Sequence, residues 1–148
     1  MTPDPSPQIL VTPSLLRRLT SMLYEILPLL AILFMAGLIF ITVVRLPQVG
    51  PVKLLFQGYL IMVSGCYLTW FWRHGGQTLA MKTWRIRLVN QHNQTLSNRQ
   101  AILRFLLAIV SIGLAGIGLF WAFFDKDKQF LHDRLAKTKI ISADTDTA

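Results

Sequence analysis

The chain contains three long apolar runs without charged residues, at Ile26–Val44, Leu54–Trp72 and Phe105–Phe124. Each run approaches the roughly 20 residues that a helix needs to cross a bilayer. A core helix of a soluble protein carries polar residues along one face, and these runs do not. The sequence therefore predicts an all-α integral membrane protein, with two firm transmembrane helices and a third apolar helical segment that is either spanning or bent.

Composition supports this class and limits the partners. Hydrophobic residues make up 53% of the chain and charged residues 15%, with a net charge of +8. The basic residues flank the apolar runs, which predicts contacts with the lipid bilayer, with anionic lipid at the basic loops. Because no nucleic-acid-binding motif accompanies the charge, we expect no nucleic-acid partner.

We expect a single membrane domain at residues 15–141, between disordered tails at residues 1–14 and 142–148. The N-terminal tail contains four prolines, which argues against regular structure there. A basic, polar loop from Arg73 to Asn98 separates the second run from the third.

The basic loop contains local structural signals of its own. Apolar and basic residues alternate from Trp84 to Leu88, which predicts a short strand, and Thr95–Leu96 is the candidate return strand of a hairpin. The following segment, Ser97–Gln100, has the spacing of a helix-capping box.

The distribution of Lys and Arg and the length of the third run disagree on whether this run crosses the membrane. Three full crossings place eight basic residues on one side and seven on the other, whereas a third segment that enters and leaves on one side gives thirteen against two. A hairpin of about 20 residues reaches only about halfway across a bilayer, so length favours a simple crossing. We expect a cytoplasmic N-terminus and favour a cytoplasmic C-terminus.

Glu25 is the most informative single residue. It follows Arg18 by seven positions, which places both on one helix face about 10 Å apart along the axis. Pro28 removes the usual hydrogen-bond donor to the carbonyl of Tyr24, so a carboxylate and a free carbonyl lie close together. This pattern indicates a cation or proton site. The structural alternative is a Glu25 at the interface that pairs with a basic group.

The C-terminal segment Phe130–Thr138 mixes charged and apolar residues close to the third run. Within it, Asp133 is a candidate partner for Arg18, Arg99 or Arg104. His132 is weaker evidence, since the three histidines do not have the spacing of metal ligands.

No enzyme site is visible in the sequence. It has no nucleophile–base pair and no metal-ligand cluster, so we expect no enzyme activity, no metal and no cofactor. The segment Gly76–Thr83 has the length of a phosphate-binding loop, but Met81 replaces the required second glycine.

Five motifs in combination resemble a known family. An arginine pair opens the first helix, and Glu25 follows. Three short segments continue the pattern at Gly76–Leu79, Trp84–Val89 and Leu103–Arg104, and Leu131–Thr138 closes it. Over Leu15–Ile141 this pattern resembles the RDD family of bacterial membrane proteins, named for one arginine and two aspartates.

The resemblance implies site residues, a location and an activity. The family's arginine falls on Arg18, or as second choice Arg17, and its two aspartates fall on Glu25 and Asp133. Glutamate keeps the charge with one more methylene, and Ala80 stands where the family usually has glycine. The implied location is the bacterial inner membrane. The implied activity is transport of unidentified ligands, or cation/proton antiport.

Two functions remain open from the sequence. The first is a transport component that uses Arg18, Glu25 and Asp133. Its supporting positions are Arg17, Pro28, Arg104 and His132, together with the loop motif Gly76, Gln77 and Thr78. Since two or three helices rarely enclose a pathway, this hypothesis predicts a homo-oligomer or a membrane-protein partner. The second function is a non-transporting accessory protein that binds other membrane proteins or anionic lipid.

Overall fold

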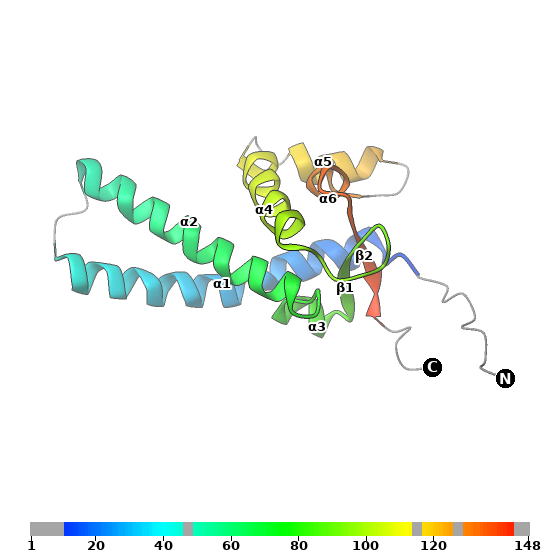
Figure 1. Ribbon diagram of the computed structural model, residues 1–148, viewed down its shortest axis with the longest axis horizontal. Coiled ribbons are helices and arrows are strands. Elements are labelled where there is room, and N and C mark those ends of the chain that lie inside the picture. The colour runs from blue at the N-terminus through cyan, green and yellow to red at the C-terminus, as the bar shows by residue number, and fades with distance from the viewer. Residues whose placement is uncertain (1–10, 46–48, 114–116, 126–128, 144–148) are drawn as a thin grey trace.

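The fold is built around a long helical hairpin. The computed structural model describes residues 11–45, 49–113, 117–125 and 129–143. Helix α1 (Leu15–Val44) and helix α2 (Gly50–Arg73) run back along one another and extend well beyond the rest of the chain (Figure 1). Both are long and apolar enough to cross a membrane. The two predicted long helices are confirmed.

Small and aromatic side chains join the two long helices. Gly37 of α1 is buried against the ring of Phe56 of α2. The ring of Phe40 lies 5.2 Å from that of Phe56 and 5.3 Å from that of Tyr59, measured between centroids. Most of the remaining apolar side chains of the hairpin point outward and are exposed, as lipid-facing helices require.

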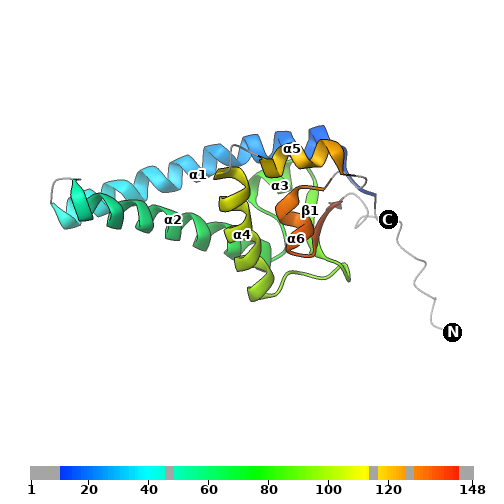
Figure 2. The ribbon, with the colours of Figure 1, turned by 90° about the horizontal axis from the view of Figure 1, so that it is seen from above.

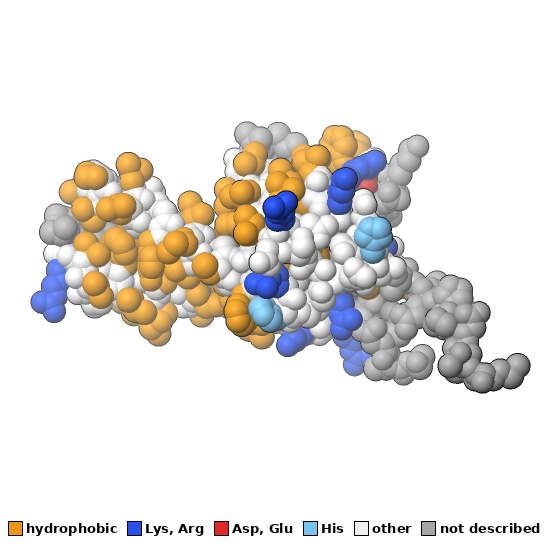
Figure 3. Space-filling view, in the orientation of Figure 1, with side chains coloured by type: hydrophobic (Ala, Val, Ile, Leu, Met, Phe, Trp, Pro, Cys, Tyr) orange, Lys and Arg blue, Asp and Glu red, His pale blue; other side chains and the backbone are white. Residues whose placement is uncertain are grey.

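A compact, mixed unit surrounds one end of the hairpin. It contains the short helix α3 (Leu79–Thr83), strand β1 (Ile86–Asn90), helices α4 (Asn98–Gly113), α5 (Ile117–Phe124) and α6 (Leu131–Leu135), and strand β2 (Thr138–Ser142). Its core includes Trp72, Leu88 and Phe130, all at most 4% exposed. Basic side chains gather over this half of the molecule, whereas apolar side chains cover the projecting half (Figure 3).

The predicted all-α class needs a correction, because β1 and β2 form a two-stranded antiparallel sheet. The predicted strand after Trp84 exists as β1, but Thr95–Leu96 is not its partner. Leu88 instead pairs with Ile140 of the C-terminal segment. A sequence pattern indicates a strand but not its distant partner, and the nearest candidate was wrong.

The described residues of the third apolar run lie in two helices. Helix α4 ends at Gly113 and α5 begins at Ile117. Figure 2 shows α4 crossing the long axis of the hairpin, while α5 runs roughly along that axis, away from the projecting end. Of the predicted spanning and bent arrangements, the described residues have the bent one.

Both predicted tails lie mainly outside the described residues, which begin at residue 11 and end at residue 143. The parts that are described contact the sheet. Ser142 belongs to β2, and its backbone N–H donates to the carbonyl of Val11 at 2.9 Å. The backbone N–H of Ala143 donates to the carbonyl of Arg85 at 2.8 Å.

Candidate functional site

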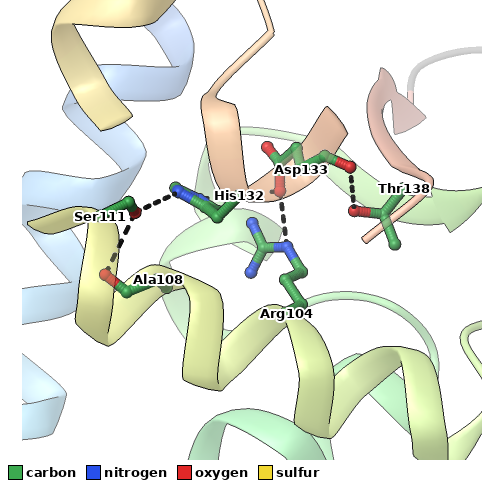
Figure 4. A network of polar contacts seen from close by, with 6 residues as sticks. All are labelled: Arg104, Ala108, Ser111, His132, Asp133 and Thr138. Carbon is green, nitrogen blue, oxygen red and sulfur yellow. Dashed lines mark hydrogen bonds and ion pairs between the residues drawn. The ribbon is translucent and has the colours of Figure 1, made fainter. Parts of the chain in front are cut away.

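A buried ion pair joins α4 to α6. The Nε atom of Arg104 donates to Oδ1 of Asp133 at 2.6 Å, and the two residues are 5% and 1% exposed (Figure 4). The guanidinium carbon of Arg104 also lies 4.2 Å from the ring centroid of Trp72, at the end of α2. Of the three partners proposed for Asp133, Arg104 is therefore in direct contact.

Arg18 lies within electrostatic reach of the same aspartate. Its side chain is buried at 2% exposure, and the charge of Asp133 acts on it. Its Nε atom donates to the carbonyl of Pro13, at 3.1 Å. Arg18 and Asp133, two of the three predicted site residues, are thus close in space, although they are 115 positions apart in the chain (133 minus 18).

Glu25 is held by hydroxyl groups. The hydroxyl of Tyr67 in α2 donates to Oε1 at 2.8 Å, and the hydroxyl of Thr78 donates to Oε2. Thr78 is 2% exposed and also caps α3, where its Oγ1 accepts from the backbone N–H of Met81. Helix α1 therefore presents Glu25 to two other elements. The predicted alternative, an ion pair of Glu25 with a basic group, is not its arrangement among the described residues.

Tyr67 is a residue that the sequence interpretation missed. A phenolic hydroxyl in an apolar run gives only a weak signal, since tyrosine is common near membrane interfaces. The available clue is the position of Tyr67 along α2. The antiparallel hairpin brings the end of α2 beside the start of α1, and Tyr67 lies near that end.

His132 extends the polar cluster formed by Arg18, Arg104 and Asp133. Its Nδ1 atom lies 3.3 Å from the hydroxyl of Ser111, and its Nε2 atom lies 3.7 Å from Oδ1 of Asp133 (Figure 4). Burial lowers the pKa of His132 to about 4, while Asp133 opposes this shift. His132 is therefore neutral at pH 7 and adds no charge beside Arg104.

Several of these groups line a partly open cavity of about 150 Å³. Its polar lining includes Arg18, Glu25, Thr78, Arg104 and His132, and most of the remaining wall is apolar. The described residues contain no group of three or more His, Cys, Asp or Glu side chains that could hold a metal ion. The cavity is thus a largely apolar space with ionisable groups on its wall.

Arg17 lies outside this cavity and attaches α1 to the sheet. Its Nε atom donates to the carbonyl of Trp84 at 2.7 Å, and its terminal nitrogens donate to the carbonyl of Arg85 and the hydroxyl of Ser142. Between the two candidate arginines, Arg18 is the one that faces the cluster.

The loop motif fixes the position of Thr78. The backbone of Gly76 adopts φ +69°, and its carbonyl accepts from the N–H of Leu88 at 2.7 Å. The side-chain amide of Gln77 donates to the carbonyl of Ile86 at 2.9 Å. Pro28 is half-buried within α1, and among the described residues it does not line the cavity.

Comparison with known proteins gives a family and a distant relative. The RDD family matches residues 12–137, which is most of the chain. An uncharacterised protein of Rickettsia prowazekii (strain Madrid E) is 28% identical over 90 residues, which cover 61% of this chain and 50% of that relative. The chain thus matches half the length of this relative. No solved structure matches the chain. The family match includes Arg18, Glu25 and Asp133, and the chain belongs to the RDD family.

Proposed function

We propose that this RDD-family chain is the ion-binding component of a membrane transporter, in which Glu25 exchanges a proton for a cation. The observation that carries the proposal is the setting of Glu25. It is the only acidic residue in the two long helices, it lines the cavity, and two hydroxyl groups hold its carboxylate. Ionisable groups within such helices usually face protein or water and mark ion pathways.

The two hydroxyl groups suit a carboxylate that changes its protonation state. A hydroxyl donates to a carboxylate oxygen, and it can rotate to accept from the O–H of a carboxylic acid. Tyr67 and Thr78 can therefore remain hydrogen bonded to Glu25 in both states. The same oxygens, with those of Glu25, are the ligand type that alkali and other hard cations prefer.

The remaining charges have a supporting role in this proposal. Asp133 forms an ion pair with Arg104, and its charge also acts on Arg18. In the proposal Glu25, held by the hydroxyl groups of Tyr67 and Thr78, is the group that binds the proton or the cation. The charge of Asp133 in α6 also stabilises Arg18 at the start of α1.

Two long helices rarely enclose a pathway, so the proposal predicts a homo-oligomer or a membrane-protein partner. We place the protein in a bacterial cytoplasmic membrane with a cytoplasmic N-terminus, following the charge distribution. The competing function is an accessory protein that binds membrane proteins or anionic lipid without transport.

Proteoliposomes test the proposal directly. Purified chain is reconstituted with a pH-sensitive dye inside, and a Na⁺ or K⁺ gradient is imposed. We expect the cation gradient to drive proton movement in the wild type, Glu25→Gln to abolish it, and Glu25→Asp to retain part of it. Thr42→Val, which changes an exposed hydroxyl of α1 bonded within its own helix, is the matched control.

Exchange that continues in Glu25→Gln would remove Glu25 from the mechanism. Absence of exchange from the wild type, both in vesicles of native lipid and in vesicles made from membranes that contain the overproduced chain, would favour the accessory function.

A further inference from the structure

The sheet constrains the path of the third apolar run. Strand β1 precedes α4 and strand β2 follows α6, and the two strands pair from Ile86–Ser142 to Asn90–Thr138. Ser142 also bonds Val11, just before α1. The segment between the strands therefore begins and ends beside the start of α1 (Figure 1). A chain that crossed the membrane once between β1 and β2 could not form this sheet.

Helix α4 lies across the hairpin near the same end. Phe105 of α4 packs against Gly65 of α2, and Arg104 lies over the ring of Trp72. Gly65 and Trp72 are both in the C-terminal half of α2, and Trp72 belongs to the same core cluster as Leu88 of β1. Since α4 crosses the long axis of α1 and α2 in Figure 2, it lies parallel to the membrane plane if the hairpin crosses the membrane.

The two faces of α4 have different neighbours. Ala101, Arg104 and Ser111 are buried against the protein. The opposite face is apolar and exposed, with fractions from 39% to 58%, at Ile102, Leu103, Leu106, Ile109 and Val110. At 100° per residue these five side chains lie within an arc of about 120°. An apolar arc of this width on an otherwise packed helix requires an apolar environment.

We propose that α4 lies along the bilayer surface on the side that carries the sheet, with this arc among the lipid chains, so that the third apolar run does not cross. Helices of this kind bury their apolar face about 5–10 Å into the boundary between headgroups and chains. The lipid is the fitting partner because α2, against which α4 packs, also exposes large apolar side chains, for example Ile61 and Met62.

Charge agrees with a lipid surface. Arg99 is exposed and falls in the middle of the apolar arc, in the first turn of α4, and Arg73 is exposed at the end of α2. A long cationic side chain in an apolar face can extend to a lipid phosphate while its methylenes stay among the chains. With both termini on one side, thirteen basic residues face two, which places this surface at the cytoplasmic leaflet.

Spin-label depth in liposomes tests this placement. In a full-length Cys66→Ser background, single labels are attached after Ile102→Cys, Ile109→Cys, Leu55→Cys or Met62→Cys, and accessibility to oxygen and to a water-soluble nickel complex gives the depth. Both pairs are seven residues apart. We expect the α4 pair at the same depth within a few ångström, and the exposed α2 pair to differ by about 10 Å.

A depth difference of about 10 Å between positions 102 and 109 would show that α4 crosses the membrane, and would overturn the proposal. Low accessibility to both oxygen and nickel at these positions would also overturn it, because a second copy or another protein would then cover the arc. Neither result depends on ion exchange at Glu25.

Discussion

The carboxylate of Asp133 and the guanidinium of Arg104 form a buried ion pair between α6 and α4, with Nε 2.6 Å from Oδ1. The charge of the same carboxylate also acts on Arg18 of α1. One aspartate near the end of the domain therefore interacts electrostatically with two buried arginines, which come from helices far apart in the sequence.

Removing Asp133 should be strongly destabilising. Asp133→Ala leaves two buried guanidinium groups without this carboxylate, and breaking a buried pair in this way costs about 3–5 kcal/mol. The free energy of unfolding in mixed detergent micelles measures the loss. Lys82→Gln, an exposed change on α3, should leave that free energy within about 0.5 kcal/mol of the wild type. Equal stability of the two variants would contradict the central role of Asp133.

Thr78 should matter through its hydroxyl. Thr78→Ala removes the helix cap of α3, worth about 1 kcal/mol, together with a hydrogen bond to the Glu25 carboxylate. Thr78→Ser keeps both contacts and should retain most of the stability and the exchange activity. Unfolding and proton-movement measurements on both variants check this. A serine variant as impaired as the alanine variant would indicate that the methyl group, not the hydroxyl, is important.

The stability should fall at acidic pH because His132 is buried in its neutral form. Its pKa is about 4 in the folded state and 6.5 for a free histidine, so the unfolded chain binds a proton first as the pH falls. Stability from this group is present above about pH 6.5 and is lost toward about pH 4, by on the order of 3 kcal/mol.

Unfolding free energies between pH 7.5 and 4 measure this effect, in the wild type and in His132→Asn. The variant should lack the part of the pH dependence that His132 supplies. His92→Asn, in an exposed turn, should keep the wild-type profile. The same slope in all three proteins would exclude His132 as its source.

Two glycines of α2 should respond differently to alanine. A Cβ atom at Gly65 would lie 2.7 Å from Cε1 of Phe105, whereas one at Gly58 meets nothing within 4 Å. Gly65→Ala should therefore destabilise the contact between α2 and α4 by about 1–3 kcal/mol, and Gly58→Ala should not. Phe105→Leu combined with Gly65→Ala should recover part of the loss, which a thermal unfolding series can measure.

The sequence was sufficient for the long helices and for much of the cluster. The uncharged runs at Ile26–Val44 and Leu54–Trp72 define α1 and α2, because length and apolarity are local properties. The motif positions Arg18, Glu25 and Asp133 line or adjoin one cavity in the structure. Arg104 could be proposed only as one of three partners for Asp133, since charge alone does not set distance.

The sheet and the hydroxyl contacts could not be predicted from local patterns. Thr138–Ser142 pairs with β1 across 48 positions (138 minus 90), and no spacing rule connects them. Tyr67 and Thr78 approach Glu25 only because α2 and α3 fold against α1. The sequence also left open whether the third apolar run spans or bends, because an uninterrupted apolar segment has no local signal that shows where the chain changes direction.

Infrared difference spectroscopy on the chain in lipid vesicles tests the central claim most directly. Na⁺ or K⁺ is added at constant pH, and the absorption of protonated carboxyl groups is recorded. The account predicts loss of a carboxylic-acid band on cation binding, with release of a proton, and absence of this change in Glu25→Gln. An unchanged spectrum in the wild type, or the same band loss in Glu25→Gln, would contradict proton–cation exchange at Glu25.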